Sequence, residues 1–217
     1  MKQYGSNVIA LDFDGTLVES NQIKDQAFDT IFSEWPEHKD AMIEWHLVHN
    51  SVDRREKFHY FVESVLGLND RKGLIEELTE KFSKLTRQAI IDCPFVEGAK
   101  DFLEYIQDRM VIFLVSATPQ LDLNEIIEER NMGKYFKELY GAPIDKVEVL
   151  KKIMKSENVS PDKMFFIGDS PEDENVAHRL GIHFMGIDSG RSLSNEKFPV
   201  FSDFNEVKQY TVHQYEL

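Results

Sequence analysis

The chain has 217 residues, of which 41% are hydrophobic and 29% charged, and 39 acidic against 25 basic residues give it a formal net charge of −14. This composition excludes a largely disordered chain, and the negative charge argues against nucleic acid as a partner because it would repel a phosphate backbone. Apolar runs are shorter than the ~20 residues of a membrane span, and the N-terminal pattern is not that of a signal peptide, so we expect a cytoplasmic protein without membrane association.

The first predicted strand carries polar residues at its carboxyl end. The apolar run 8–11 is followed by Asp12, Asp14, Gly15 and Thr16. A short run of apolar, partly β-branched residues that ends near a glycine is typical of a buried parallel strand. Residues two apart share one face of a strand, so we expect Asp12 and Asp14 to point to the same side. Because neighbouring carboxylates repel unless a cation or a proton accompanies them, the stretch predicts a metal site or an acid–base pair.

A helical pattern follows the first strand. Apolar residues recur at three- and four-residue spacings around residues 21–35, 42–48, 58–66 and 74–90. Such stripes predict amphipathic helices, which can close a small bundle of their own. We therefore predict two domains: a helical cap at residues 18–90, inserted into a core that consists of residues 1–17 and 91–217.

From residue 91 onward the pattern alternates between helix and strand, which is typical of right-handed crossovers in a parallel sheet. The predicted strands lie at residues 110–115, 138–141, 163–167 and 182–187, and the predicted helices at 99–106, 119–131, 146–156, 171–180 and near 203–210. The predicted fold class is α/β. It is a Rossmann-like, three-layer core with a parallel five-stranded sheet, and an α-helical bundle cap is inserted after the first strand.

In open parallel sheets, ligands bind beyond the carboxyl ends of the strands. Several predicted strand ends carry polar residues: Asp12, Asp14 and Thr16; Ser116 and Thr118; Lys146; and Asp169, Ser170 and Asp173. An aspartate can attack phosphorus to form an aspartyl-phosphate, and a second carboxyl can protonate the leaving alkoxide and then activate water. Mg²⁺ prefers such oxygen ligands. The convergence therefore predicts phosphoryl-transfer chemistry.

The chain resembles the haloacid dehalogenase superfamily of phosphohydrolases in its run Asp12-Phe13-Asp14-Gly15-Thr16, which is similar to the family's first motif. The resemblance implies that Asp12 is the nucleophile and Asp14 the general acid and base. The helical insertion resembles the cap of the subgroup that contains phosphoglycolate phosphatase and β-phosphoglucomutase.

Further motifs extend the resemblance over nearly the whole chain. Ser116 is similar to the hydroxyl of the second motif, which binds the transferred phosphoryl group, and Lys146 to the lysine of the third. Residues 168–173 resemble the fourth motif, which implies that Asp169 binds the metal and Asp173 supports the site. The implied cofactor is Mg²⁺, bound by Asp12, by the main-chain carbonyl of Asp14 and by Asp169. The candidate phosphate-binding residues are Thr16, Ser116, Ala117 and Lys146.

Two positions leave alternatives open. The second motif often continues with asparagine, whereas Ala117 follows Ser116 here, so Thr118 or a main-chain N–H would have to replace that donor. Ser116 and Thr118 could also cap the following helix. Other lysines compete with Lys146 for the third motif, namely Lys151, Lys152 and Lys155. We favour Lys146, because a helix that follows a strand begins at the edge where the site lies.

Arg54 and Arg55 form a basic cluster in the predicted cap of an acidic protein. A guanidinium suits a substrate carboxylate or a second phosphate, although a solvated helix start explains the same pattern. We expect a Mg²⁺-dependent phosphomonoester hydrolase that acts on a small phosphorylated metabolite, and no obligate protein partner. The alternatives are a sugar-phosphate mutase of the same fold and a non-catalytic binding protein.

Overall fold

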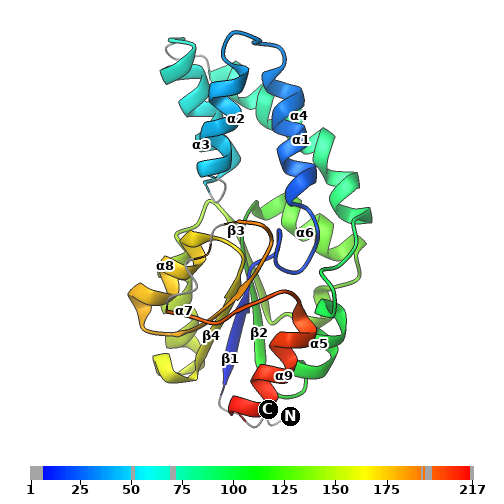
Figure 1. Ribbon diagram of the computed structural model, residues 1–217, viewed down its shortest axis with the longest axis vertical. Helices are drawn as coiled ribbons and strands as arrows, with labels where there is room; N and C mark the ends of the chain where they lie inside the picture. The colour runs from blue at the N-terminus through cyan, green and yellow to red at the C-terminus, as the bar shows by residue number, and fades with distance from the viewer. Residues whose placement is uncertain (1–6, 50–51, 69–71, 192, 194–196, 216–217) are drawn as a thin grey trace. The chain divides into compact units, whose positions relative to one another are not determined.

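The computed structural model describes residues 7–49, 52–68, 72–191, 193 and 197–215 (Figure 1). The chain divides into two compact units: a core unit that runs through Glu19 and resumes at Cys93, and a helical unit from Ser20 to Asp92. The domain boundaries predicted from the sequence, after residues 17 and 90, stay predictions. Within the described ranges, no helix is long and apolar enough to cross a membrane.

The core unit is built on a parallel sheet with the strand order β3-β2-β1-β4-β5-β6. The strands are β1 (Val8–Leu11), β2 (Val111–Pro119), β3 (Glu138–Ala142), β4 (Met164–Gly168), β5 (His183–Ile187) and β6 (Val200–Phe201). The predicted α/β fold is confirmed, but the predicted count of five strands was one too low. β6 has only two residues, which pair with Gly186 and Ile187 of β5. A strand of two residues is too short to show the alternation of apolar and polar side chains by which strands are predicted.

Helices cover both faces of the sheet (Figure 1). They are α5 (Ala99–Ile106), α6 (Gln120–Glu129), α7 (Lys146–Glu157), α8 (Pro171–Leu180) and α9 (Phe204–Tyr215), with 3₁₀ turns η2 (Gly133–Tyr135) and η3 (Pro161–Lys163). Val8 and Ala10 of β1 pack in one apolar cluster with residues of α7 and α8, and α5 packs against α9. β1 is buried throughout because it lies between two layers and between two neighbouring strands.

Several helix ends differ from the prediction by one or more residues. Pro119 is the N-cap of α6 and not its first helical residue, since β2 runs on through Pro119 before the chain turns. The last helix, α9, extends to Tyr215.

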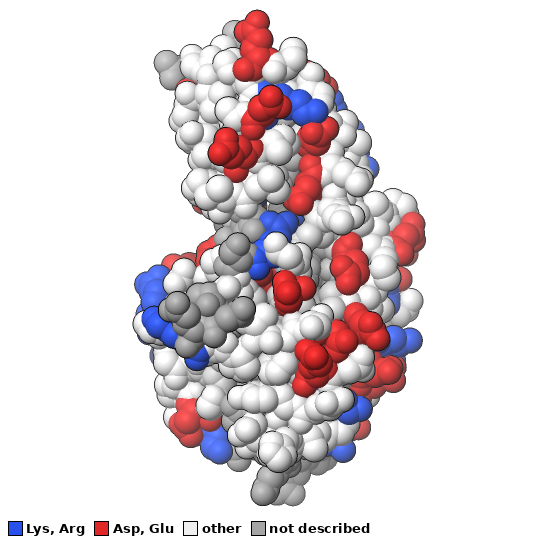
Figure 2. Space-filling view, in the orientation of Figure 1, with Lys and Arg blue, Asp and Glu red and all other residues white. Residues whose placement is uncertain are grey.

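The helical unit consists of α1 (Asn21–Phe32), α2 (Lys39–Val48), α3 (Arg54–His59), the π-helical segment η1 (Tyr60–Val65) and α4 (Lys72–Asp92). The single helix predicted around residues 58–66 is thus a short α-helix that continues as a π-helix. The interior of this unit is rich in phenylalanine: Phe28 contacts the rings of Phe32, Phe58 and Phe82. Acidic side chains are scattered over both units on the face shown in Figure 2.

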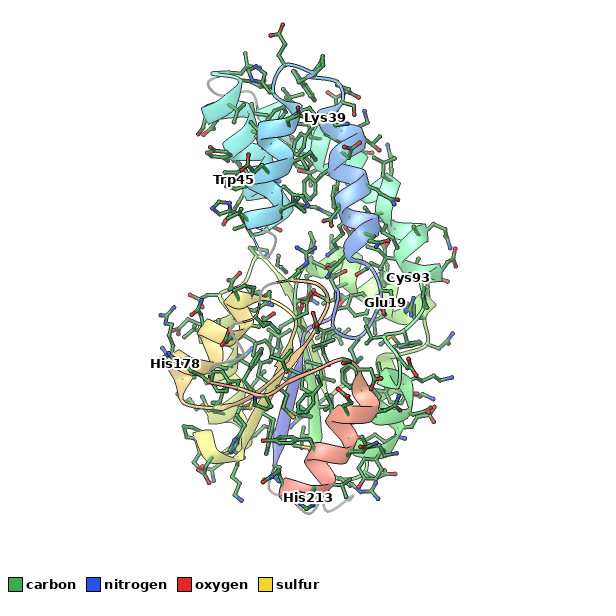
Figure 3. All side chains as sticks on the ribbon, in the orientation of Figure 1. Glu19, Lys39, Trp45, Cys93, His178 and His213 are labelled. Atoms are coloured by element: carbon green, nitrogen blue, oxygen red, sulfur yellow. The ribbon has the colours of Figure 1, made fainter. Side chains whose placement is uncertain are left out.

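The two segments of the chain that connect the units lie side by side within the core unit. Val18 forms an antiparallel bridge with Phe95, and the N–H of Glu19 donates to the carbonyl of Pro94 at 3.0 Å. Glu19 and Cys93 mark this place in Figure 3. Backbone contacts within the core unit therefore join the two points between which the helical unit is inserted.

A buried polar network lies inside the helical unit. The side chain of Lys57 is 2% exposed, and its Nζ lies 2.9 Å from Nδ1 of His46. His46 Nε2 lies 2.9 Å from Oδ1 of Asp25. An ammonium can only donate, so opposite a charged Lys57 the Nδ1 of His46 accepts and its Nε2 donates to Asp25. The Lys57 ammonium also lies 5.1 Å from the ring centroid of Phe28.

We predict that His46→Leu destabilises the helical unit by about 3 kcal/mol, because it removes an acceptor of a buried ammonium. The double variant His46→Leu/Lys57→Met should recover most of this loss, since the buried charge is then absent. Urea unfolding followed by tryptophan fluorescence measures this unit, because both tryptophans of the chain, Trp35 and Trp45, belong to it.

His59→Leu is the matched control, because His59 belongs to the same unit and 42% of its side chain is exposed; it should change stability by less than about 0.5 kcal/mol. A double variant that is as unstable as His46→Leu would contradict this account of the network.

Candidate active site

Asp12 occupies the centre of the carboxyl edge of the sheet. It directly follows β1, which pairs with β2 on one side and β4 on the other. Its N–H donates to the carbonyl of Ile167 at 2.9 Å, which extends the β1–β4 pairing by one residue. Asp12 is therefore held where the ends of three strands meet.

Asp12, Asp169 and Asp173 form a cluster of buried carboxylates. One oxygen from each lies within 4.8 Å of the others, and the residues are 6%, 3% and 0% exposed. Lys146 Nζ contacts two of them, at 3.2 Å from Asp12 Oδ1 and 2.6 Å from Asp173 Oδ1. The arrangement brings one ammonium and three carboxylates together away from bulk water.

Burial raises the pKa of Asp12 well above its usual value, and the nearby carboxylates of Asp173, Asp169 and Asp14 raise it further, against the opposing effect of Lys146. For Lys146, burial works against the charged form, but Asp12 and Asp173 hold the pKa of its ammonium above its usual value. The single ammonium does not balance the carboxylates around it. Additional positive charge among them would favour ionised Asp12.

Local geometry at the start of α8 fixes Asp173. Ser170 is the N-cap of α8, and its Oγ accepts from the N–H of Asp173 at 3.2 Å while its hydroxyl donates to Asp173 Oδ2 at 2.6 Å. This reciprocal pair satisfies an N–H that the helix itself leaves without a partner. Gly168 permits the close packing, because a Cβ there would lie 2.6 Å from the carboxyl group of Asp173.

Asp14 turns toward the end of β2 and not into the carboxylate cluster. Its Oδ2 accepts from the Thr118 hydroxyl at 2.7 Å, and the Ser116 hydroxyl lies 3.4 Å away. β1 ends at Leu11, so strand alternation does not govern the direction of Asp14. The Ser116 Oγ also accepts from the N–H of Thr118 at 3.1 Å. Thr118, considered from the sequence as a replacement donor, is thus engaged with the second carboxylate.

The other candidates differ in their surroundings. Ala117 lies in β2 and is partly exposed. Thr16 is fully buried, and its hydroxyl has no hydrogen-bond partner among the described residues. The competing Lys151 points away from the cluster, where it pairs with Glu148 and is half-exposed. Lys152 and Lys155 are exposed on α7.

Arg54 and Arg55 belong to the helical unit. The guanidinium of Arg54 lies 5.5 Å from the ring centroid of Phe82, and Arg55 lies 3.5 Å from Glu76 with about half of its side chain exposed. The contact of Arg55 fits a solvated helix start, whereas Arg54 is partly buried with its Nε inaccessible. The substrate-binding role of both arginines stays a prediction.

Two residues near the cluster were missed in the sequence. The Ser189 hydroxyl donates to Asp169 Oδ2 at 2.6 Å, and Nε of Arg191 lies 3.9 Å from the same oxygen. Both lie in the loop after β5, which ends at Ile187. The rule that singled out the polar residues after the other strands applies equally here, so the signal was present.

The cluster fits a hard divalent cation. Carboxylate oxygens from two strand ends and one helix start converge in a buried place, and Mg²⁺ takes a few such ligands while it keeps several waters. Burial, and to a lesser extent the neighbouring carboxylates, raises the pKa of Asp12, and a cation among these groups would lower it. Asp12 and Asp169 are the residues that would hold the ion, with Asp173 in support, because both oxygens of Asp173 already contact Lys146 and Ser170.

Comparison with known families agrees with this geometry. The sequence profile of the haloacid dehalogenase-like hydrolases matches residues 9–187, from β1 through β5. The chain belongs to this family. As a haloacid dehalogenase-like hydrolase it is an enzyme, and the resemblance drawn from its motifs is confirmed.

The individual proteins that resemble this hydrolase share a low percentage of identical residues with it. It is 24% identical over 206 residues to phosphoglycolate phosphatase 1 of Pseudomonas aeruginosa, which covers 87% of this chain and 73% of that protein. A solved structure of a predicted phosphoglycolate phosphatase from Haemophilus somnus has a TM-score of 0.75 at 15% identity and covers 97% of this chain and 99% of that one. A haloacid dehalogenase hydrolase from Bacillus subtilis, solved bound to magnesium, has a TM-score of 0.70 at 13% identity, with 94% and 97% covered. These structures share its fold.

We predict that Gly168→Ala destabilises the hydrolase by about 1–3 kcal/mol, because the new Cβ displaces the carboxyl group of Asp173 and overpacks the site. Gly133→Ala is the matched control in the same unit: no atom lies within 4 Å of its added Cβ, so stability should stay the same or rise by up to about 1 kcal/mol. Urea unfolding followed by circular dichroism measures both. Equal stability of the two variants would show that Asp173 yields its position freely.

Proposed function

We propose that this hydrolase is a Mg²⁺-dependent phosphatase that cleaves phosphomonoesters of small metabolites through an aspartyl-phosphate on Asp12. One observation carries the proposal. The carboxylates of Asp12, Asp169 and Asp173 form a buried cluster, and Lys146 contacts two of them. A separate carboxyl group, that of Asp14, lies two residues from Asp12 and has its own hydroxyl partner. This arrangement offers a nucleophile, a cation site and an acid–base group in one place.

The proposed reaction has two steps. The Asp12 carboxylate attacks phosphorus, the bond from phosphorus to the ester oxygen breaks, and Asp14, which starts this step protonated, gives that oxygen its proton. Asp14, now a carboxylate, removes a proton from water, which attacks the aspartyl-phosphate, so phosphate is released, Asp12 returns as the carboxylate and Asp14 as the protonated acid. Thr118 holds the Asp14 carboxyl group through both steps.

Two positive charges support these steps. Lys146, already 3.2 Å from Asp12 Oδ1, orients the nucleophile and faces the charge that develops on the phosphoryl oxygens. A Mg²⁺ held by Asp12 and Asp169 with Asp173 in support, and by the main-chain carbonyl of Asp14, would neutralise both the carboxylates and the phosphoryl group. Ser116 and the main-chain N–H of Ala117 are the proposed phosphoryl donors.

The proposed substrate is a small phosphorylated metabolite in the cytoplasm. Phosphoglycolate is the first ester to test, because the curated relative is a phosphoglycolate phosphatase. A panel that also contains sugar phosphates and an aryl phosphate, assayed with Mg²⁺, tests the class of reaction. Free phosphate as the product supports hydrolysis, whereas an isomerised sugar phosphate would contradict it.

We predict that Asp12→Asn abolishes Mg²⁺-dependent release of phosphate from an aryl phosphate, with a loss of at least about 10⁴-fold, because covalent catalysis is removed. Acid-quenched wild-type enzyme should carry a phosphoryl group on the peptide that contains Asp12, and the variant should not. Mass spectrometry of the digested protein measures this.

Asp101→Asn serves as the control, because Asp101 is exposed on α5; it should keep wild-type turnover. Turnover by Asp12→Asn within tenfold of wild type, or a phosphoryl group on another residue, would overturn the proposed mechanism.

We predict that Asp169→Asn raises the Mg²⁺ concentration needed for half-maximal activity by at least about 100-fold, because an anionic ligand is lost. The matched control is Glu172→Gln, a carboxylate three residues away that is exposed at the start of α8. It should leave the Mg²⁺ requirement within about twofold. An unchanged requirement in Asp169→Asn would remove this residue from the metal site.

A further inference from the structure

The loop after β5 contributes a hydroxyl to the carboxylate cluster. Ser189 Oγ donates to Asp169 Oδ2 at 2.6 Å, and the guanidinium of Arg191 approaches the same oxygen, with Nε at 3.9 Å. Asp169 is 3% exposed. One of its oxygens is thus engaged by a neighbouring strand end, while the carboxylate as a whole still faces Asp12 and Asp173.

The backbone of this loop holds Ser189 in place. The N–H of Asp188 donates to the carbonyl of Phe201 in β6 at 2.8 Å, and the N–H of Ser189 donates to the carbonyl of Ile187 at 3.0 Å. Gly190 has a φ of +80°, and its N–H donates to Asp188 Oδ1 at 3.0 Å. The Ser189 hydroxyl therefore comes from a tight turn that is anchored to the edge of the sheet.

A hydrogen bond to one oxygen of a carboxylate fixes the plane of the group, and so the direction of its other oxygen. Metal ligands are commonly oriented in this way by partners that do not touch the ion, and loss of such a partner typically costs 10- to 100-fold in affinity. The 2.6 Å separation is that of a charge-assisted O–H···O⁻ bond, which is stronger than a bond between neutral groups.

We propose that Ser189 is a positioning residue that sets the divalent-cation affinity of the hydrolase by orienting Asp169. This inference rests on the proposed function, because it takes Asp169 as a ligand. Ser189 acts only through Asp169. Its loss therefore lowers the affinity for the ion but leaves turnover nearly intact once the site is saturated.

The test is a titration of the metal-free protein with Mn²⁺, with the free ion followed by electron paramagnetic resonance, and with Mg²⁺ added as competitor. Ser189→Ala should weaken Mn²⁺ binding by about 10- to 100-fold. Ser189→Thr keeps the hydroxyl and should restore binding to within about threefold of wild type. The aryl phosphatase assay should show Ser189→Ala within about threefold of wild-type kcat at saturating Mg²⁺.

Ser156→Ala is the matched control, because Ser156 donates to a carboxylate oxygen of Glu157 at 3.2 Å, at the far end of α7 from Lys146. Its Mn²⁺ affinity should equal that of wild type. The melting temperature of each metal-free variant is measured in parallel, since a hydroxyl that only stabilises the loop lowers that temperature without a selective loss of affinity.

Two results would overturn the inference. One is wild-type Mn²⁺ affinity in Ser189→Ala, whether or not its melting temperature is lowered. The other is a loss of affinity that Ser189→Thr fails to restore. In each case the proposed function stands, provided that wild type binds Mn²⁺ and Asp12→Asn is inactive. A wild-type protein that binds no Mn²⁺ overturns the proposed metal site itself.

Discussion

The rest of the site depends on the ion pairs that the ammonium group of Lys146 forms with buried carboxylates. This ammonium contacts Asp12 and Asp173, which arrive from the first strand and from the helix after the fourth. Without it, Asp12 and Asp173 would be buried carboxylates that lack the ammonium contacting both of them, at a cost of several kcal/mol per ion. Lys146 begins α7, whose N-cap Asp145 accepts from the N–H groups of Val147 and Glu148. The position of the N-terminus of α7 thus determines where the positive charge that balances the carboxylates lies.

The part of the site that could be predicted from the sequence is the part that is local in the chain. Asp12 and Asp169 each directly follow an apolar run, and the edge rule for parallel sheets brings such positions together. Lys146 could be preferred over the later lysines of its helix because only a first turn lies at that edge. An approximate order of the strands in the sheet was sufficient for these inferences.

The contacts that could not be predicted join side chains across long separations. Thr118 reaches Asp14 from 104 residues away, and Ser189 reaches Asp169 from 20 residues away on the neighbouring strand. Which hydroxyl meets which carboxylate depends on register and on rotamers, to which a linear pattern is blind. β6 was missed for a related reason, since two residues carry no periodicity and its pairing with β5 is purely tertiary.

The antiparallel bridge between Val18 and Phe95 has a consequence for how the chain folds and diversifies. The bridge joins the ends of the insertion within the core unit, so the core needs from the intervening residues only that their two ends lie close together. An inserted segment that folds through its own local contacts meets this need and keeps the entropy of closing the long loop low. Exchange of that segment for another of similar end-to-end distance would then leave the sheet and its carboxylates undisturbed. The enzyme's chemistry and its inserted segment can therefore change independently in evolution.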